Sequence, residues 1–169
     1  NAWETRSFLP PGTDSTTYMW GTSQGYDDLL NALQLLKSSG LDFRFSHIGS
    51  GEMEREIRAQ VQALNLENQV RLLGTLPHEE VIKYYRKAHC FVLACKVAEN
   101  GDRDGIPNVL VEAMAVGVPV ISTSVSAIPE LIENGVTGIL VEPGKPVMLA
   151  RAIQHLFFHP ENYREQVKQ

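Results

Sequence analysis

The chain has 169 residues, which is enough for one compact domain with a hydrophobic core. Its composition, 43% hydrophobic and 21% charged, is that of an ordinary globular protein, and its formal net charge of −5 argues against nucleic acid as the main partner. No apolar run reaches the roughly 18 residues of a membrane-spanning helix, so we expect no transmembrane segment. Two cysteines that are interpreted as free thiols fit a reducing cytoplasm.

Residues 1–16 are rich in Pro, Gly, Ser and Thr, as is typical of a linker or tail. After them, strand patterns alternate with helical patterns. The first half of the chain predicts a strand at 17–20, a helix at 26–39, a strand at 43–48, a helix from about 53 to 64, a strand at 70–73 and a helix at 78–87.

The second half continues this alternation. It predicts a strand at 90–94, a helix from about Pro107 to Gly117, a strand at 118–122, a short helix at 128–133, a strand at 138–141 and a last helix that ends before Pro160. Residues 159–169 form a polar tail. Near-continuous apolar strands joined by helices predict an α/β fold for residues 17–158: a Rossmann-like, doubly wound, mostly parallel sheet of about six strands with helices on both faces. Ligands of such sheets bind beyond the carboxyl ends of the strands.

The cysteines and histidines predict neither a disulfide nor a metal site. Cys90 and Cys95 flank a predicted strand at an odd separation, so we expect two buried thiols on opposite faces. His155 and His159 have the spacing of a chelating pair, but no third ligand lies near them in the sequence, and exposure near a helix end is the better interpretation. His47, in a strand, is interpreted as a partly buried structural residue.

Two carboxylates, Asp104 and Glu112, flank a Gly-x-Pro-Asn turn that opens an apolar helix. Ionised carboxylates accept hydrogen bonds from sugar hydroxyls, and the free N–H groups at a helix start favour phosphate. The combination suits a nucleotide sugar. The alternative is an acid that complements the helix dipole and a solvent-facing glutamate, and spacing alone slightly favours that alternative.

The ordered sequence around this helix resembles the signature of retaining glycosyltransferases of family 4, which have the GT-B architecture of two Rossmann-like domains. Asp-Gly-Ile-Pro-Asn-Val-Leu-Val-Glu-Ala-Met-Ala, residues 104–115, is similar to their Glu-x7-Glu element, and the lead-in from Asn100 resembles the branch that builds bacterial exopolysaccharides. Further matching pieces are Gly49-Ser50-Gly51-Glu52, residues 70–74, residues 128–138 and Leu140-Val141-Glu142-Pro143. The match covers about residues 17–158 and corresponds to the carboxyl-terminal, donor-binding half.

The resemblance implies roles by position. Glu112 would bind the nucleotide ribose, and Asp104 would contact the donor sugar near the reacting centre. The base would meet the turn at Gly74 and Leu76. The diphosphate and sugar would be held by the backbone of Gly105, Ile106, Pro107, Asn108 and Val109. Gly49 and Gly51 would let the backbone approach the phosphates, although a Gly-x-Gly alone also fits a tight strand-to-helix turn.

One departure from the family concerns the cations that usually neutralise the leaving diphosphate. Thr22 and Gln24 stand roughly where a basic residue and a Lys-Gly pair are usual. Arg103 is a candidate substitute, although an ion pair with Asp102 is the more economical interpretation. Losing both cations would cost several kcal/mol of transition-state stabilisation.

The resemblance therefore implies the donor-binding domain of a retaining glycosyltransferase that uses a UDP- or GDP-sugar. Its partners would be an amino-terminal GT-B domain and a saccharide or lipid-linked acceptor at the inner face of the membrane. No cofactor or metal is expected, and the isolated domain is expected to transfer little sugar. The alternatives are a non-catalytic nucleotide- or partner-binding module and a different open α/β enzyme, such as a GT-B epimerase or phosphorylase. Among the latter, a phosphorylase would need a pyridoxal lysine, and the context of Lys96 does not fit.

Overall fold

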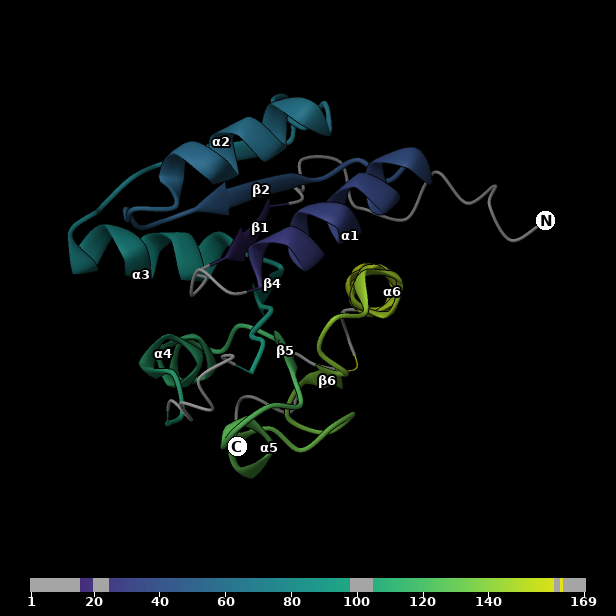
Figure 1. Cartoon of the computed structure of the whole chain (residues 1–169). Helices are drawn as coiled ribbons and strands as arrows, with labels where there is room; N and C mark the ends of the chain where they lie inside the picture. The colour runs from purple at the N-terminus through teal and green to yellow at the C-terminus, as the bar shows by residue number, and fades with distance from the viewer. Residues whose placement is uncertain (1–15, 20–24, 98–104, 160–161, 163–169) are drawn as a thin grey trace.

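The computed structural model describes residues 16–19, 25–97, 105–159 and 162. In this part of the chain six strands alternate with six helices (Figure 1). The strands are β1 (Thr16–Met19), β2 (Arg44–His47), β3 (Val70–Leu72), β4 (Cys90–Leu93), β5 (Val120–Thr123) and β6 (Ile139–Val141). The helices are α1 (Tyr26–Ser38), α2 (Glu54–Ala63), α3 (His78–Lys87), α4 (Asn108–Val116), α5 (Ile128–Leu131) and α6 (Pro146–Phe158).

The strands form one sheet in the order β3-β2-β1-β4-β5-β6, and each neighbouring pair is parallel. This is the strand order of doubly wound dinucleotide-binding sheets, so the predicted fold class is confirmed. All carboxyl ends of the strands lie along one edge of the sheet. We call that edge the rim; its described parts are Gly25 and the segments 48–53, 73–77, 94–97, 105–107, 124–127 and 142–145.

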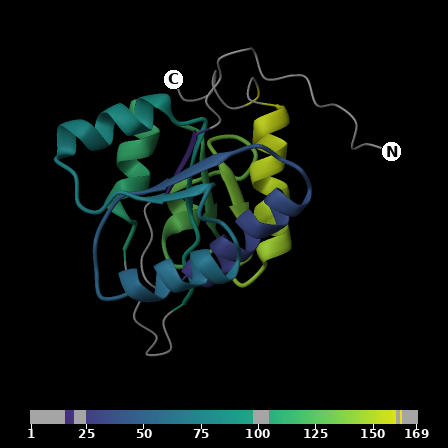
Figure 2. The ribbon, with the colours of Figure 1, turned by 90° about the horizontal axis from the view of Figure 1, so that it is seen from above.

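Two hydrophobic cores lie on opposite faces of the sheet. Helices α1, α2 and α6 cover one core, which includes Phe45, and helices α3, α4 and α5 cover the other, which includes Phe91. Figure 2 shows α6 beside α1 on one side and α3 beside α4 on the other. Both phenylalanines are almost fully buried, because a parallel sheet that is covered on both faces has no solvated side.

The prediction that a strand begins at Val118 is wrong by two residues. Gly117 adopts a left-handed conformation with φ +93°, and the Val118 N–H donates to the Ala113 carbonyl over 3.0 Å. This arrangement closes the carboxyl end of α4, so Val118 belongs to the helix cap. Pro119 has no N–H for the sheet, and β5 therefore starts at Val120.

The two cysteines lie as predicted. Cys90 belongs to the core under α1, Cys95 belongs to the core under α3 and α4, and the two buried thiols form no disulfide with each other. None of the described helices combines the length and the apolar character needed to cross a bilayer.

Candidate functional site

The switch point of the sheet lies between β1 and β4, where the strand order reverses. Gly25 precedes α1 and residues 105–107 precede α4, and both lie at the carboxyl ends of the strands, where open α/β sheets bind their ligands. Of the residues predicted to act there, Asp104, Arg103, Thr22 and Gln24 lie outside the described residues. The site is therefore built from the described parts of the rim.

The amino end of α4 opens onto the switch point. Pro107 precedes the helix in an extended conformation (φ −62°, ψ 125°), and no side chain caps it. Leu110 N–H donates to the Pro107 carbonyl, whereas Asn108 and Val109 lie in the turn whose N–H groups have no partner within the helix. Gly105 and Asn108 are exposed, and Ile106, Pro107 and Val109 are half-buried. Such a helix start favours an anion.

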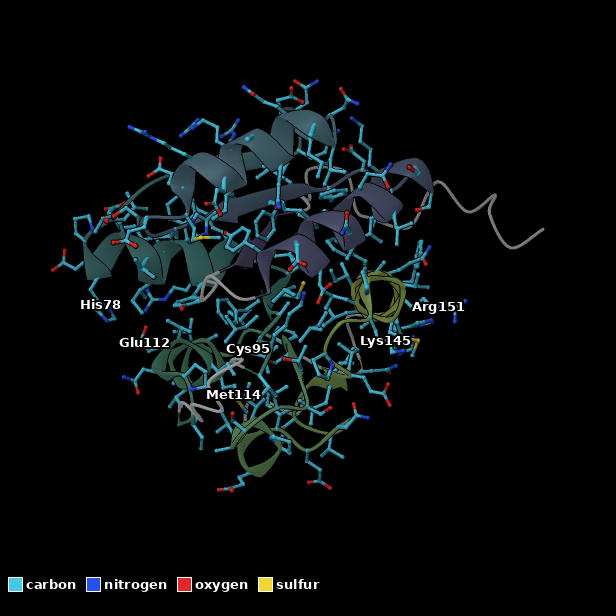
Figure 3. All side chains as sticks on the ribbon, viewed as in Figure 1. His78, Cys95, Glu112, Met114, Lys145 and Arg151 are labelled. Carbon is cyan, nitrogen blue, oxygen red and sulfur yellow. The ribbon has the colours of Figure 1, made fainter. Side chains whose placement is uncertain are left out.

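Glu112 is half-buried in the second turn of α4, on the side that faces α3 (Figure 3). Its neighbour there is Tyr85 of α3: burial raises the pKa of the Tyr85 phenol, and the charge of Glu112 raises it further. The Tyr85 hydroxyl donates to the Val109 carbonyl over 3.4 Å, and its ring contacts Phe91 edge-on at 5.6 Å. Tyr85 thus ties the start of α4 to α3 and β4. The helical spacing of 78–87 predicts that Tyr85 points inward, but not that it contacts α4.

The two glycine turns at the ends of β2 and β3 are joined. Gly49 N–H donates to the Gly74 carbonyl over 2.7 Å, and the hydroxyls of Ser50 and Thr75 lie 2.8 Å apart. Gly49 (φ +131°) and Gly74 (φ +69°) adopt conformations that other residues rarely take. Gly51 is exposed in the first turn, and Leu76 is half-buried in the second. The structure thus brings the residues predicted for phosphate and for base into adjacent turns.

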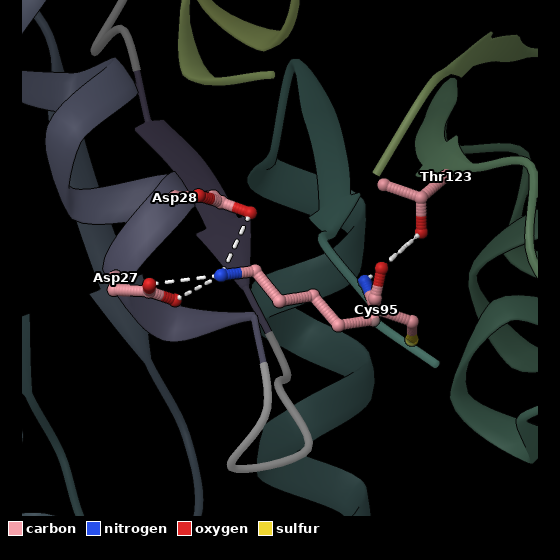
Figure 4. A network of polar contacts seen from close by, with 5 residues as sticks. Asp27, Asp28, Cys95 and Thr123 are labelled. Carbon is pink, nitrogen blue, oxygen red and sulfur yellow. Dashed lines mark hydrogen bonds and ion pairs between the residues drawn. The ribbon is translucent and has the colours of Figure 1, made fainter. Parts of the chain in front are cut away.

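A lysine that the sequence did not single out for binding crosses the switch point. Lys96 Nζ, at the end of β4, lies 2.9 and 2.8 Å from the two carboxylate oxygens of Asp27 and 3.1 Å from Asp28, both in the first turn of α1 (Figure 4). The hydrogen bond with Asp27 raises the pKa of Lys96. An ammonium group has three N–H donors, and here three carboxylate oxygens surround it. We call this contact the Lys96 strap; it links α1 to β4.

Thr123 holds the backbone next to the strap. Its hydroxyl accepts a hydrogen bond from Cys95 N–H over 3.0 Å and donates one to the Cys95 carbonyl over 2.8 Å (Figure 4). Ser122 donates to the Leu93 carbonyl over 2.8 Å in the same way. The Thr123 contacts extend the pairing of β4 with β5 beyond Leu93 and hold the backbone of Cys95, the residue before Lys96.

Replacing Lys96 with methionine is expected to reduce the free energy of unfolding by roughly 0.2–1 kcal/mol, because the side chains of Lys96 and Asp27 are 32% and 53% exposed and solvent screens such pairs. Urea unfolding of Lys96→Met, Asp27→Asn and the double variant measures the coupling. Additive effects of the two substitutions would contradict a strap that contributes to stability.

Within the described residues, no three His, Cys, Asp or Glu side chains gather where they could hold a metal ion. The ring centroids of His155 and His159, whose spacing in the sequence is that of a chelating pair, lie 4.9 Å apart, and both residues are exposed at the carboxyl end of α6.

Known proteins resemble this chain along most of its length. The family described as "Glycosyl transferases group 1" matches residues 21–169. The amylovoran biosynthesis glycosyltransferase AmsK of Erwinia amylovora is 39% identical over 133 residues, which are 79% of this chain and 33% of that protein. The putative colanic acid biosynthesis glycosyltransferase WcaL of Escherichia coli is 38% identical over 130 residues, which are 77% of this chain and 32% of that protein.

Solved structures show the same fold. Alr3699/HepE of Anabaena, solved in complex with UDP, superposes with a TM-score of 0.75 at 22% identity and covers 92% of this chain and 42% of its own. The C-terminal domain of the group 1 glycosyl transferase LpcC of Francisella tularensis has a TM-score of 0.72 at 24% identity, with 91% of this chain and 80% of that domain covered. This chain spans about a third of the length of the two curated relatives. With its residues 21–169 matched, the chain belongs to the family of glycosyl transferases group 1.

Proposed function

We propose that this chain is the donor-binding, carboxyl-terminal domain of a retaining GT-B glycosyltransferase of family 4. It would bind a UDP- or GDP-sugar for transfer to a saccharide or lipid-linked acceptor. The observation that carries the proposal is half-buried Glu112 on a helix whose uncapped start opens onto the switch point of the sheet. The names of the relatives, which concern amylovoran and colanic acid biosynthesis, and the UDP complex of a protein with the same fold support it.

The proposed roles follow the chemistry of each group. Glu112 accepts hydrogen bonds from the ribose hydroxyls, since a carboxylate is an acceptor only. The N–H groups at the start of α4, in the segment 105–109, hold the diphosphate. The base meets the turn at Gly74 and Leu76, Asp104 contacts the donor sugar, and Arg103 adds positive charge. The fixed dipoles of these backbone amides stabilise the charge of the diphosphate, without a metal or cofactor.

The proposed unit of function is residues 17–158, with 1–16 as a linker and 159–169 as a tail. An amino-terminal GT-B domain would supply the acceptor site and close the cleft, at the cytoplasmic face of the membrane when the acceptor is lipid-linked. The length of the curated relatives, about three times that of the matched segment, supports a second domain.

The second candidate is a non-catalytic nucleotide- or partner-binding module. The Lys96 strap favours it, because the basic side chain at the switch point is already held by two carboxylates. This candidate predicts nucleotide binding without sugar transfer when the amino-terminal domain is present, and the first candidate predicts both.

Titration of UDP, GDP and ADP, followed by amide NMR, tests nucleotide binding. The expected shifts fall on residues 105–112 and 74–77. Glu112→Ala is expected to reduce the affinity for the tightest-binding of the three nucleotides about 10- to 100-fold, because hydrogen bonds to a charged group are lost. Glu67→Ala, an exposed carboxylate before β3 at the opposite edge of the sheet, is the matched control and is expected to bind normally. Wild-type affinity in Glu112→Ala would refute the ribose assignment, and no binding of any nucleotide at millimolar concentration would refute the donor site.

A further inference from the structure

A buried polar pair joins α1 to the carboxyl end of β2. His47, the last residue of β2, is 8% exposed, and Tyr26, the first residue of α1, is 3% exposed. The Tyr26 hydroxyl is hydrogen-bonded to His47 Nδ1, and the two rings meet edge-on with centroids 5.1 Å apart. Burying a polar pair in a core costs free energy that an aliphatic pair would not cost. The ring nitrogen of His47 that is not hydrogen-bonded to Tyr26, Nε2, is therefore a candidate for a functional contact.

The tautomer of His47 depends on which group donates in its hydrogen bond with Tyr26. Burial raises the pKa of the Tyr26 phenol, so the phenol keeps its proton and has a hydrogen to donate. Burial also lowers the pKa of His47, against the opposing charge of Glu54, so the ring is neutral near pH 7. With Nδ1 as the acceptor of the Tyr26 O–H, the single ring proton lies on Nε2.

The edge of the ring that carries Cε1 and Nε2 faces the Gly49 turn. His47 Cε1 and Nε2 lie 3.9 Å from the point where a Cβ atom on Gly49 would stand. Because Gly49 has no side chain, no Cβ atom stands over this edge of the imidazole. The same turn carries the Gly49–Gly74 hydrogen bond, so Nε2 lies beside the junction of the two glycine turns.

The strand order then places His47 beneath the path of the proposed nucleotide. The proposed base contact follows β3 and the proposed diphosphate contact follows β4, and β2 and β1 lie between them. Neighbouring strands are about 4.8 Å apart, so the two contacts are about 14 Å apart along the rim. A nucleotide that spans them crosses the end of β2, where its ribose and phosphate oxygens are acceptors for an N–H donor.

We propose that His47 is a donor-substrate contact whose Nε2–H donates a hydrogen bond to a ribose or phosphate oxygen of the nucleotide, with Tyr26 as the residue that sets its tautomer. This inference rests on the proposed nucleotide site. It assigns a ligand role to a strand residue that sequence patterning treats as structural.

Two substitutions separate this role from a structural one. The side-chain oxygen of asparagine can accept the Tyr26 O–H in place of Nδ1, but asparagine does not reach the position of Nε2, whereas glutamine places an N–H near Nε2. We expect His47→Asn to weaken UDP binding about tenfold, the effect of one lost hydrogen bond, and His47→Gln to stay within about threefold of wild type. Thermal unfolding of both variants checks that the fold is retained.

A measurement on the unmodified chain complements the variants. Nitrogen-15 NMR of the imidazole is expected to show the Nε2–H tautomer in the free chain and a shift of the Nε2–H signal on addition of UDP. An Nδ1–H tautomer, a signal that UDP leaves unmoved while amides of 105–112 shift, or equal UDP affinity of the two variants would overturn the role of His47 alone. Failure of wild type to bind UDP, GDP or ADP would overturn the nucleotide site and this inference together.

Discussion

Among glycine-to-alanine substitutions at the described rim glycines, Gly25→Ala is expected to cause the largest loss of unfolding free energy. A Cβ atom on Gly25 would lie 1.3 Å from the Ala94 carbonyl oxygen and 2.4 Å from its carbon. Both atoms belong to the backbone, so no side-chain rotation relieves the clash. The start of α1 would have to move away from the end of β4. Overpacking costs typically about 1–3 kcal/mol and more when backbone must shift, so we expect a loss of at least about 3 kcal/mol.

Gly51→Ala is the matched control. Gly51 is exposed in the turn after β2, nothing lies within 4 Å of its added Cβ, and its backbone is outside the left-handed region. Its unfolding free energy is expected to stay within about 0.5 kcal/mol of wild type. Urea unfolding followed by circular dichroism measures both variants. Equal midpoints for Gly25→Ala and wild type would show that α1 does not approach β4 this closely.

The second large effect is expected from Leu110→Ala. Leu110 is fully buried in the core under α3, α4 and α5, two residues before Glu112. Truncating a buried leucine removes transfer free energy and leaves a cavity, so we expect a loss of about 2–5 kcal/mol. Because the side chain anchors the helix that carries Glu112, nucleotide affinity is expected to fall as well.

Val111→Ala is the control on the same helix. Val111 follows Leu110 directly but is 45% exposed, so its truncation is expected to change the unfolding free energy by about 0.5 kcal/mol or less. Urea unfolding and UDP titration are measured on both variants. If Leu110→Ala costs no more than Val111→Ala, α4 is not anchored through Leu110, and the account of how Glu112 is positioned is wrong.

Local patterns predict most of the elements because apolar periodicity reports burial directly. Leu29, Leu33 and Leu36 recur at helical spacing and are buried in α1, and the unbroken apolar run of β4 is buried on both faces. Element ends were less predictable. Val118 carries a strand-like side chain, but its N–H completes the cap of α4, and a propensity pattern does not contain that hydrogen bond.

The candidate site likewise contains features that the sequence predicts and contacts that it does not. Glu112, the turn before α4 and the glycine turns are visible in the chain because each is a local feature with its own chemistry. Tyr85, Lys96 and Tyr26 are not, since their partners lie 24, 69 and 21 residues away in the sequence. Their contacts form because the strand order brings segments that are distant in the sequence close together.

The sequence by itself therefore determined the alternation of strands and helices, the buried faces and the helix start beside Glu112, because these depend on neighbours within a few residues. Only the tertiary structure decided what meets at the rim: the Gly49–Gly74 junction, the Lys96 strap and the Tyr26–His47 pair. The physical reason is that crossover connections bring distant segments to one edge of a parallel sheet. Side chains that look structural along the chain, His47 among them, thereby come to lie at the edge where we propose that the ligand binds.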